Sequence, residues 1–507
     1  MKKEVRVRFA PSPTGALHIG GVRTALYNYL FAKKNNGTFI LRIEDTDQTR
    51  YVPGAEEYIK ETFKWLGIEP DEGVGHGGPH APYRQSERKD IYLKYAQQLI
   101  DAGRAYYAFD TPEELDAMRE RLKQAKADNQ VYDSLSRQTM RNSLTLDADE
   151  VKQVIDQKVP YVIRLKVDRN QEIGLVDMIR GQVTVSSDHI DDKVLMKSDG
   201  MPTYHLANVI DDHLMNISHV IRGEEWLPSA PLHVLLYQYF GWADSMPQFA
   251  HLPLLLKPDG NGKLSKRDGD KHGYPVFPLE WTDPTGGEKS MGFREQGYLP
   301  EAILNFLAFL GWNPGTEQEL FTLHELVQHF SIERINKSGA KFDIEKGKWF
   351  NQQYLKNVPD TTLASGLMTI LTRENISCSQ EKAAAICGLM KERVTFPQEI
   401  WTTGQFFFFQ PEAYDEKVIQ KKWNEEAKTI IGDYAKALSA ADTLTSDLAL
   451  SILHDVLERH GVGAGKVMQA LRVAITGLAG GPDLMPVIAV LGKEETIKRI
   501  EHALKSI

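Results

Sequence analysis

Residues 5–21 read Val5-Arg6-Val7-Arg8-Phe9-Ala10-Pro11-Ser12-Pro13-Thr14-Gly15-Ala16-Leu17-His18-Ile19-Gly20-Gly21. Apolar side chains alternate with arginines over residues 5–9, which is the period-two pattern of a strand. Two prolines and a glycine over residues 11–15 end that strand in a tight loop. Helical spacing then predicts a helix over about residues 17–34, and residues 39–43 read as the next strand. This order predicts a parallel α/β sheet that binds a ligand at the carboxyl ends of its strands.

The composition is that of an ordinary globular protein large enough for several domains. The 507 residues are 42% hydrophobic and 25% charged, and no apolar run is long enough to span a bilayer. The amino terminus lacks the apolar segment of a signal peptide, so we expect a cytoplasmic protein without a membrane partner. The net charge of −9 does not argue against nucleic acid, because a local basic face is sufficient.

Other segments give a coarse map of the chain. Residues 133–142 are polar and are expected to be mobile, whereas residues 194–196 are expected to return to the first sheet. Residues 273–297 are rich in proline, glycine and charge, which predicts an insertion outside the core. Helical periodicity dominates from about residue 347 onward and predicts an all-helical carboxyl-terminal half. Further helices are expected over residues 87–104, 111–126 and 232–240, and further strands within residues 159–190 and 220–222.

The glycines and the histidine of the opening stretch suit a nucleoside triphosphate. Gly15, Gly20 and Gly21 would allow phosphates to approach the backbone, and the helix that begins near His18 offers free N–H groups and a positive dipole end. His18 would add a donor where negative charge develops. The alternative is a strand-to-helix turn with a capping histidine.

A second motif, Lys263-Leu264-Ser265-Lys266-Arg267, lies on a predicted glycine-bounded loop. Two ammonium groups three residues apart can close over phosphates and stabilise a leaving pyrophosphate. The alternative is a solvated basic loop, because charge runs are common on surfaces.

Together the two motifs resemble the signatures of class I aminoacyl-tRNA synthetases, with Gly21 at the fourth position of the His-Ile-Gly-His pattern. Four more segments resemble bacterial glutamyl-tRNA synthetases, and the resemblance runs nearly end to end. They are Arg42-Ile43-Glu44-Asp45-Thr46-Asp47 and the segments 78–88, 198–208 and 220–226.

The resemblance implies a Rossmann-type parallel nucleotide-binding sheet in an α/β fold, with an α+β insertion and a helical anticodon-binding half. It places the two halves of the Rossmann catalytic domain at residues 1–83 and 202–262, around an acceptor-end-binding insertion at 84–201. A stem-contact domain with the lysine motif would follow at 263–346, and the anticodon-binding domain at 347–507.

The resemblance also implies a monomeric glutamate–tRNA ligase. Such an enzyme uses ATP and Mg²⁺ to activate L-glutamate as glutamyl-adenylate, and transfers it to the 3′ end of tRNA(Glu). The implied catalytic residues are His18, Lys263 and Lys266. The implied ATP-binding residues are Pro11, Ser12, Thr14, Gly15, His18, Gly20, Gly21 and Lys266. The implied glutamate-binding residues are Arg8, Ser12, Glu44, Tyr204, Asn208 and Arg222.

Specificity for glutamate follows from the chemistry of a γ-carboxylate, which the planar fork of arginine binds best. In the family, the positions of Arg8 and Arg222 face this carboxylate, and glutamine-specific relatives lack an arginine at the second position. A glutamine amide would forfeit charge-assisted hydrogen bonds, and each ~1.4 kcal/mol lost is a tenfold discrimination. The alternative for Arg222 is an ion pair with Glu224 or Glu225.

Zinc and the anticodon complete the expectations. Some relatives carry a zinc site just after the position of Ala105, but residues 106–109 contain no cysteine, so we predict no structural zinc and no metal ligands. Arg393 is the candidate for an anticodon base contact, with an exposed helix charge as the alternative. Four phenylalanines at 406–409 could stack on bases, but a buried cluster is favoured because consecutive rings cannot all face one groove.

Three rival functions fit less of the chain. A truncated relative that glutamylates a base within a tRNA would lack the helical half. A tRNA-binding protein without catalysis should have lost His18, Glu44 or Lys266, and all three are present. A small-molecule adenylating ligase would not explain Arg222. The sequence leaves open whether tRNA(Gln) is also charged and whether activation needs bound tRNA.

Overall fold

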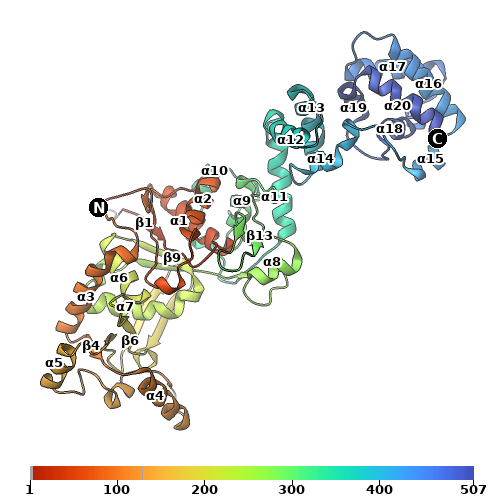
Figure 1. Ribbon diagram of the computed structural model, residues 1–507. Coiled ribbons are helices and arrows are strands. Elements are labelled where there is room, and N and C mark those ends of the chain that lie inside the picture. Colours follow the sequence, from red (N-terminus) through yellow and green to blue (C-terminus); the bar gives the residue numbers. More distant parts are fainter. Residues whose placement is uncertain (1–3, 128) are drawn as a thin grey trace. The chain divides into compact units, whose positions relative to one another are not determined.

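The computed structural model describes residues 4–127 and 129–507, and it contains two compact units (Figure 1). Unit 1 comprises Met1–Gln296 and Ile303–Ile344, and unit 2 comprises Gly297–Ala302 and Glu345–Ile507. Within the described part of the chain, no helix combines the length and the apolar character that a membrane crossing requires. The five-part division of the chain into domains stays a prediction.

The opening stretch folds as predicted. Strand β1 (Arg6–Phe9) pairs in parallel with β2 (Thr38–Leu41), and helix α1 (Ile19–Lys34) connects them. Strand β3 (Glu72–Gly73) extends this sheet on the far side of β2. Every residue of β1 is buried, as expected for a parallel sheet that is covered on both faces.

A second sheet continues the first through a backbone hydrogen bond. Its strand order is β7-β6-β10-β9, and all neighbouring strands are parallel except the antiparallel pair β6 and β7. The N–H of Ser218 donates to the carbonyl of Arg6 at 2.9 Å, which aligns the starts of β9 and β1. The carboxyl ends of β1 and β9 therefore lie at one edge, as a nucleotide-binding sheet requires. The strands are β6 (Glu172–Asp177), β7 (Gly181–Ser186), β9 (His219–Gly223) and β10 (Gln248–Leu252).

A third, antiparallel sheet corrects one prediction. Strand β8 (Val194–Met196) does not return to the first sheet but pairs with β5 (Val162–Leu165), which in turn pairs with β4 (Ala105–Ala108). A strand of three apolar residues carries no information about its partner, so its sequence could not assign the sheet.

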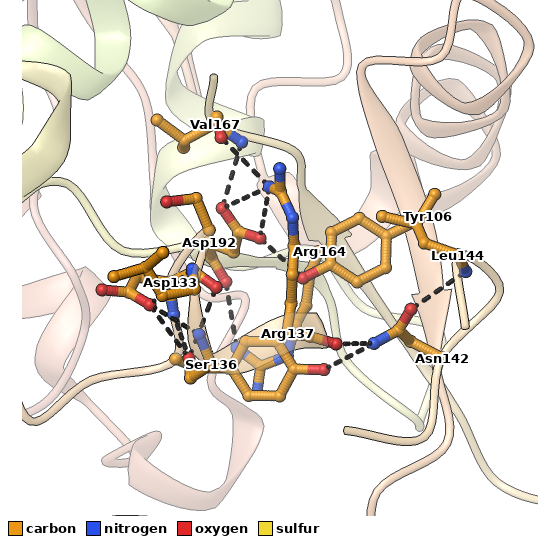
Figure 2. Close-up of polar contacts among 12 residues, drawn as sticks. Tyr106, Asp133, Ser136, Arg137, Asn142, Leu144, Arg164, Val167 and Asp192 are labelled. Atoms are coloured by element: carbon orange, nitrogen blue, oxygen red, sulfur yellow. Dashed lines mark hydrogen bonds and ion pairs between the residues drawn. The ribbon is translucent and has the colours of Figure 1, made fainter. Parts of the chain in front are cut away.

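The polar segment 133–142 is also different from its prediction, because it is tied down by hydrogen bonds (Figure 2). The buried carboxylate of Asp133 accepts from the N–H of Ser136 at 2.9 Å. Asn142 is fully buried and donates to the carbonyl of Arg137 at 2.7 Å. Polar composition predicted mobility, whereas these buried side chains form hydrogen bonds with backbone groups of the same segment.

Residues 273–297 are not wholly outside the core. Phe293 is fully buried, and the carbonyl of Val276 accepts from the N–H of Ile19 at the start of α1, at 2.8 Å. The start of this segment therefore contacts the first residue of α1. Its tip is the hairpin of β12 (Trp281–Thr282) and β13 (Lys289–Ser290).

Three further helices of unit 1 lie where the sequence predicts them, namely α3 (Lys89–Asp101), α4 (Pro112–Gln124) and α7 (Ala230–Tyr239), whereas the remaining helices and short strands were not predicted. Helix α4 begins at a capping box of Thr111 and Glu114 with Pro112 in its first turn, as its sequence indicates. The elements are α2 (Ala55–Leu66), α3 (Lys89–Asp101), α4 (Pro112–Gln124), α5 (Ala148–Asp156), α6 (Tyr204–Leu214), α7 (Ala230–Tyr239), α8 (Lys266–His272), α10 (Leu323–His329), β11 (Leu255–Leu256) and β14 (Ala340–Lys341), with α9 (Pro300–Phe309) crossing the boundary between the units.

Unit 2 is helical, as predicted, and it has its own apolar core. Phe406 and Phe407 belong to that core, whereas the side chain of Phe409 is 50% exposed. A buried cluster is therefore the right interpretation for two of the four rings. The helices are α11 (Ile344–Asn357), α12 (Asp360–Arg373), α13 (Gln380–Met390), α14 (Glu399–Thr403), α15 (Glu416–Lys422), α16 (Glu425–Ser439), α17 (Ser446–Arg459), α18 (Met468–Thr476), α19 (Leu484–Leu491) and α20 (Lys493–Ser506).

Candidate active site

A cavity of about 490 Å³ lies where β1 and β9 end and α1 begins. It collects nearly every residue that the sequence assigns to ATP or glutamate. Lys266 is the exception, because it is not among the residues that line the cavity. Arg393, which was assigned to the anticodon, belongs to unit 2. The assigned residues that line it are Arg8, Pro11, Ser12, Thr14, Gly15, His18, Gly20, Gly21, Glu44, Tyr204, Asn208, Arg222 and Lys263.

His18 caps α1 with one ring nitrogen, and its other ring nitrogen has no partner among the described residues. Its Nδ1 accepts the backbone N–H of Gly20 at 3.1 Å, so the ring proton is on Nε2. That Nε2 is buried and has no partner among the described residues, which is a fit for a phosphate oxygen. Burial, helped by the charge of Lys263, lowers the pKa of His18 to about 4, so the ring is neutral at pH 7. The capping alternative and the phosphate prediction are therefore compatible.

The glycines of the first motif have different structural reasons. Gly15 has φ +140°, a conformation that side chains disfavour, and the space beside it is open. A Cβ at position 21 would lie 2.6 Å from Leu17, so packing excludes a histidine there without a shift of that side chain. The departure from the family's fourth position is thus accommodated by the packing of α1.

The lysine motif corrects the prediction of an irregular loop. Ser265 caps α8 in a capping box with Asp268, so Lys266 is the first residue of a helix. The Ser-x-x-Asp spacing is a recognised start signal, and the sequence analysis missed it. Leu264 is buried, and its N–H donates to the carbonyl of Leu255 at 2.8 Å. This anchor places Lys263 on the cavity wall.

Both lysines are held by carboxylates. Lys263 pairs with Glu225 at 3.0 Å, and Lys266 pairs with Glu288 at the hairpin tip at 2.8 Å. All four side chains are at least 32% exposed, so these pairs are weak and exchangeable.

Arg8 and Glu44 on the cavity wall belong to a buried charge network, which the sequence predicted only in part. Arg8 donates Nε and Nη2 to the two oxygens of Asp212, at 2.9 and 3.1 Å. Arg42 bridges Asp212 and Glu44 at 2.8 and 2.9 Å, and Asn208 also donates to Glu44 at 3.1 Å. The roles of Arg42 and Asp212 were missed, although each directly follows a run of apolar residues or an acidic neighbour of such a run. Such a charge is a signal of a buried ion pair.

Arg222 has a different environment, because all of its partners are neutral. Its Nε donates to His251 at 3.0 Å, and its Nη1 donates to the hydroxyl of Tyr204 at 2.8 Å. Its Nη2 donates to the carbonyl of Trp226 at 3.3 Å. Among the residues that the structure describes, no carboxylate forms an ion pair with it, so the pairing with Glu224 or Glu225 is wrong.

The charges around Arg222 favour the binding of an anion in this part of the cavity. Arg8 and Arg42 are compensated by Asp212 and Glu44, whereas Arg222 is 5% exposed and has no counter-ion in the described chain. Burial, and then repulsion from Arg8, lower the pKa of Arg222, which remains positively charged at pH 7 because an arginine titrates far above neutrality. A ligand that brings a carboxylate to Arg222 would complete the network.

The comparisons with known proteins agree with this geometry. Residues 4–349 match the catalytic domain of class I tRNA synthetases for glutamate and glutamine, and residues 323–504 match an anticodon-binding domain. The glutamate–tRNA ligase of Cytophaga hutchinsonii is 62% identical over 99% of this chain and 97% of its own, and that of Amoebophilus asiaticus is 57% identical over 100% and 99%. A crystal structure of a glutamate tRNA ligase from Elizabethkingia meningosepticum, in complex with its amino acid, is 52% identical and covers 99% of both chains with a TM-score of 0.93.

The chain therefore belongs to the class I tRNA synthetases of the glutamate and glutamine branch. Within that branch its function is that of a glutamate–tRNA ligase, since its full-length relatives carry that activity in their names. The described residues include no group of three or more His, Cys, Asp or Glu side chains placed to hold a metal ion. The absence of structural zinc stays a prediction.

Proposed function

We propose that the cavity binds ATP beside α1 and L-glutamate against Arg222, forms glutamyl-adenylate, and transfers the glutamyl group to the 3′ end of tRNA(Glu). One observation supports this assignment above the others. Within the described chain, a buried guanidinium without a carboxylate partner shares one cavity with a buried imidazole nitrogen that has no hydrogen-bond partner. The first suits a side-chain carboxylate, and the second suits a phosphate.

The residues divide the work by their positions. Arg222, together with Arg8, would bind the γ-carboxylate, and Glu44 would accept the ammonium group. Tyr204, Asn208 and Ser12 would complete the amino-acid site. Glu44 is fit for its part because it is buried and shares the wall with Arg222.

The chemistry then needs positioning and charge stabilisation, without a protein nucleophile. The α-carboxylate attacks the α-phosphorus in line, the P–O bond to pyrophosphate breaks, and a mixed anhydride forms. His18 would donate Nε2–H to a phosphate oxygen, while Lys263 and Lys266 would leave their carboxylates to stabilise the pyrophosphate. Mg²⁺ bound to the triphosphate would supply further positive charge. The terminal ribose hydroxyl of the tRNA then attacks the anhydride, and AMP leaves.

The family assignment supports further proposals for the rest of the chain. Unit 2 would read the anticodon, with the exposed Arg393 as a base contact. The enzyme would work as a monomer in the cytoplasm. Gel filtration with light scattering would test the monomeric state.

A charging assay tests the proposed function directly. The purified protein is incubated with ATP, Mg²⁺ and labelled glutamate or glutamine, on purified tRNA(Glu) and tRNA(Gln) separately. Glutamate on tRNA(Glu) is the expected product, and exclusive use of glutamine would refute the proposal. Pyrophosphate exchange with and without tRNA establishes whether activation needs bound tRNA, and a metal assay on the same sample tests for stoichiometric zinc.

A further inference from the structure

A chain of three buried polar side chains leads away from the cavity behind Arg222. Asp177 ends strand β6, His251 lies on the neighbouring strand β10, and Arg222 lies on β9, which is the next strand in the sheet. Their exposed fractions are 1%, 0% and 5%. Asp177 Oδ2 lies 2.6 Å from Nδ1 of His251, and the Nε2 of His251 lies 3.0 Å from Nε of Arg222. Strand pairing therefore aligns a carboxylate, an imidazole and a guanidinium in one line.

The two partners fix the protonation of His251. A carboxylate only accepts, so Nδ1 must carry the proton that it shares with Asp177. The Nε of arginine only donates, so Nε2 must offer its lone pair. The ring is therefore the neutral Nδ1–H tautomer, and burial favours the same state because it lowers the pKa of His251.

A neutral acceptor has a consequence that a carboxylate would not have. It orients the guanidinium through Nε, yet it leaves the positive charge uncompensated. The Asp177 carboxylate also accepts the backbone N–H groups of Ile179 and Arg180, at 3.0 and 2.8 Å, so its own position is fixed by the fold. His251 does not line the cavity, so it acts on a ligand only through Arg222.

We propose that His251, oriented by Asp177, is the positioning residue that holds Arg222 with its charge free for the side-chain carboxylate of the substrate, and so sets the preference for glutamate. This inference rests on the proposed function of the same cavity. An acidic residue at position 251 would neutralise Arg222, and an apolar residue would leave its Nε buried without an acceptor. A neutral imidazole avoids both effects.

Two amide substitutions separate this role from packing. In H251N the amide nitrogen occupies the position of Nδ1 and keeps the contact with Asp177, but the side chain is too short to reach Arg222. In H251Q the longer side chain places its amide oxygen near the position of Nε2, so it can accept from Arg222. The matched control is H324N, which alters an exposed histidine on α10. All variants are compared as full chains by thermal melting, and in aminoacylation with glutamate and ATP varied separately.

We expect H251N to raise the KM for glutamate by about tenfold to a hundredfold, the worth of one hydrogen bond to a charged group. The KM for ATP should change by less than about threefold, and H251Q should recover most of the loss. Discrimination against glutamine should narrow by a similar factor.

Three results would overturn the inference: an unchanged KM for glutamate in H251N, an equal rise in the KM for ATP, or a defect in H251Q as large as that in H251N. If the unsubstituted chain charges tRNA(Glu) with glutamate and H251N behaves like it, only the role of His251 fails. If the unsubstituted chain does not charge tRNA(Glu) at all, the proposed function itself fails.

Discussion

The two ends of the cavity hold their charges in opposite ways. At the amino-acid end, the side chains of Arg8 and Asp212 are each 3% exposed and share two hydrogen bonds. At the phosphate end, Lys263 and Glu225 are 59% and 42% exposed and meet at a single contact. Buried pairs are costly to break, whereas exposed pairs contribute roughly 0–1 kcal/mol. If the cavity binds its substrates as proposed, the amino acid would meet a rigid network, and the lysines would be free to exchange their carboxylates for phosphates.

The largest effect is expected at Arg222, whose buried charge has no carboxylate partner among the described residues. Arg222→Ala removes the fork that is proposed to bind the γ-carboxylate, so kcat/KM for glutamate should fall by about a thousandfold, or ~4 kcal/mol, with ATP binding intact. Pyrophosphate exchange with each substrate varied in turn measures both. Arg222→Lys is the control, because it keeps a charge without the planar fork. Unchanged glutamate activation in the alanine variant would disprove the basis of specificity.

Asp212 tests the rigidity of the same end through stability. Asp212→Asn leaves Arg8 and Arg42 without a shared counter-ion, which should lower the free energy of unfolding by about 3 kcal/mol. Urea denaturation of the full chain, with and without the substitution, measures this loss of unfolding free energy. A loss of unfolding free energy below ~1 kcal/mol would mean that the buried ion pair of Arg8 and Asp212 contributes no more than an exposed ion pair does.

The ion pair of Asp212 should also make the stability of the chain depend on pH in the acid range. Burial by itself would raise the pKa of Asp212, but the charges and hydrogen bonds of Arg8 and Arg42 outweigh it, so the pKa lies below its usual 3.8. A carboxylate with a depressed pKa in the folded state contributes stability that is fully present above the unfolded value, and this contribution is lost as pH falls through the folded value. The unsubstituted chain should therefore lose more stability below pH 3.8 than Asp212→Asn does.

These charges also show what the sequence could and could not predict. Alternating residues and glycines predicted β1, α1 and β2, because those patterns are local. The partners of Arg8 and Arg222 were beyond reach, since Asp212 and His251 are brought to them by pairing between distant strands and by α6. Residues 273–297 were misjudged for the same reason. Their composition is that of a loop, and only the tertiary fold places Val276 against α1.

His18 caps α1 and, in the proposed function, would also contact a phosphate. In His18→Asn the amide oxygen can still cap α1, as Nδ1 does now for Gly20, but nothing replaces the Nε2 donor. We expect near-normal thermal stability and a fall of about a hundredfold in the rate of adenylation. His18→Ala is the control that loses both the cap and the donor. If the asparagine variant adenylates normally, the phosphate role of Nε2 is wrong.

A substitution of Lys266 tests whether the exposed lysines contribute to adenylation. Lys266→Ala should lower the rate of adenylation by about tenfold to a hundredfold, because it removes a cation that would stabilise the leaving pyrophosphate. Binding of tRNA, measured by filter retention, should change by less than about twofold. Equal losses in both assays would indicate a tRNA-contact role instead.

The smallest effect is expected at Glu288, the residue that pairs with Lys266 at the hairpin tip. Glu288→Gln removes the ion pair and keeps the shape of the side chain. Because the Glu288 side chain is 65% exposed, the stability of the chain should change by less than ~0.5 kcal/mol. Freed from its carboxylate, Lys266 should bind phosphates slightly better, so the KM for ATP should fall by at most about twofold. A large rise in that KM would mean that Glu288 positions Lys266 for catalysis, and the exposed end would then be as preorganised as the buried one.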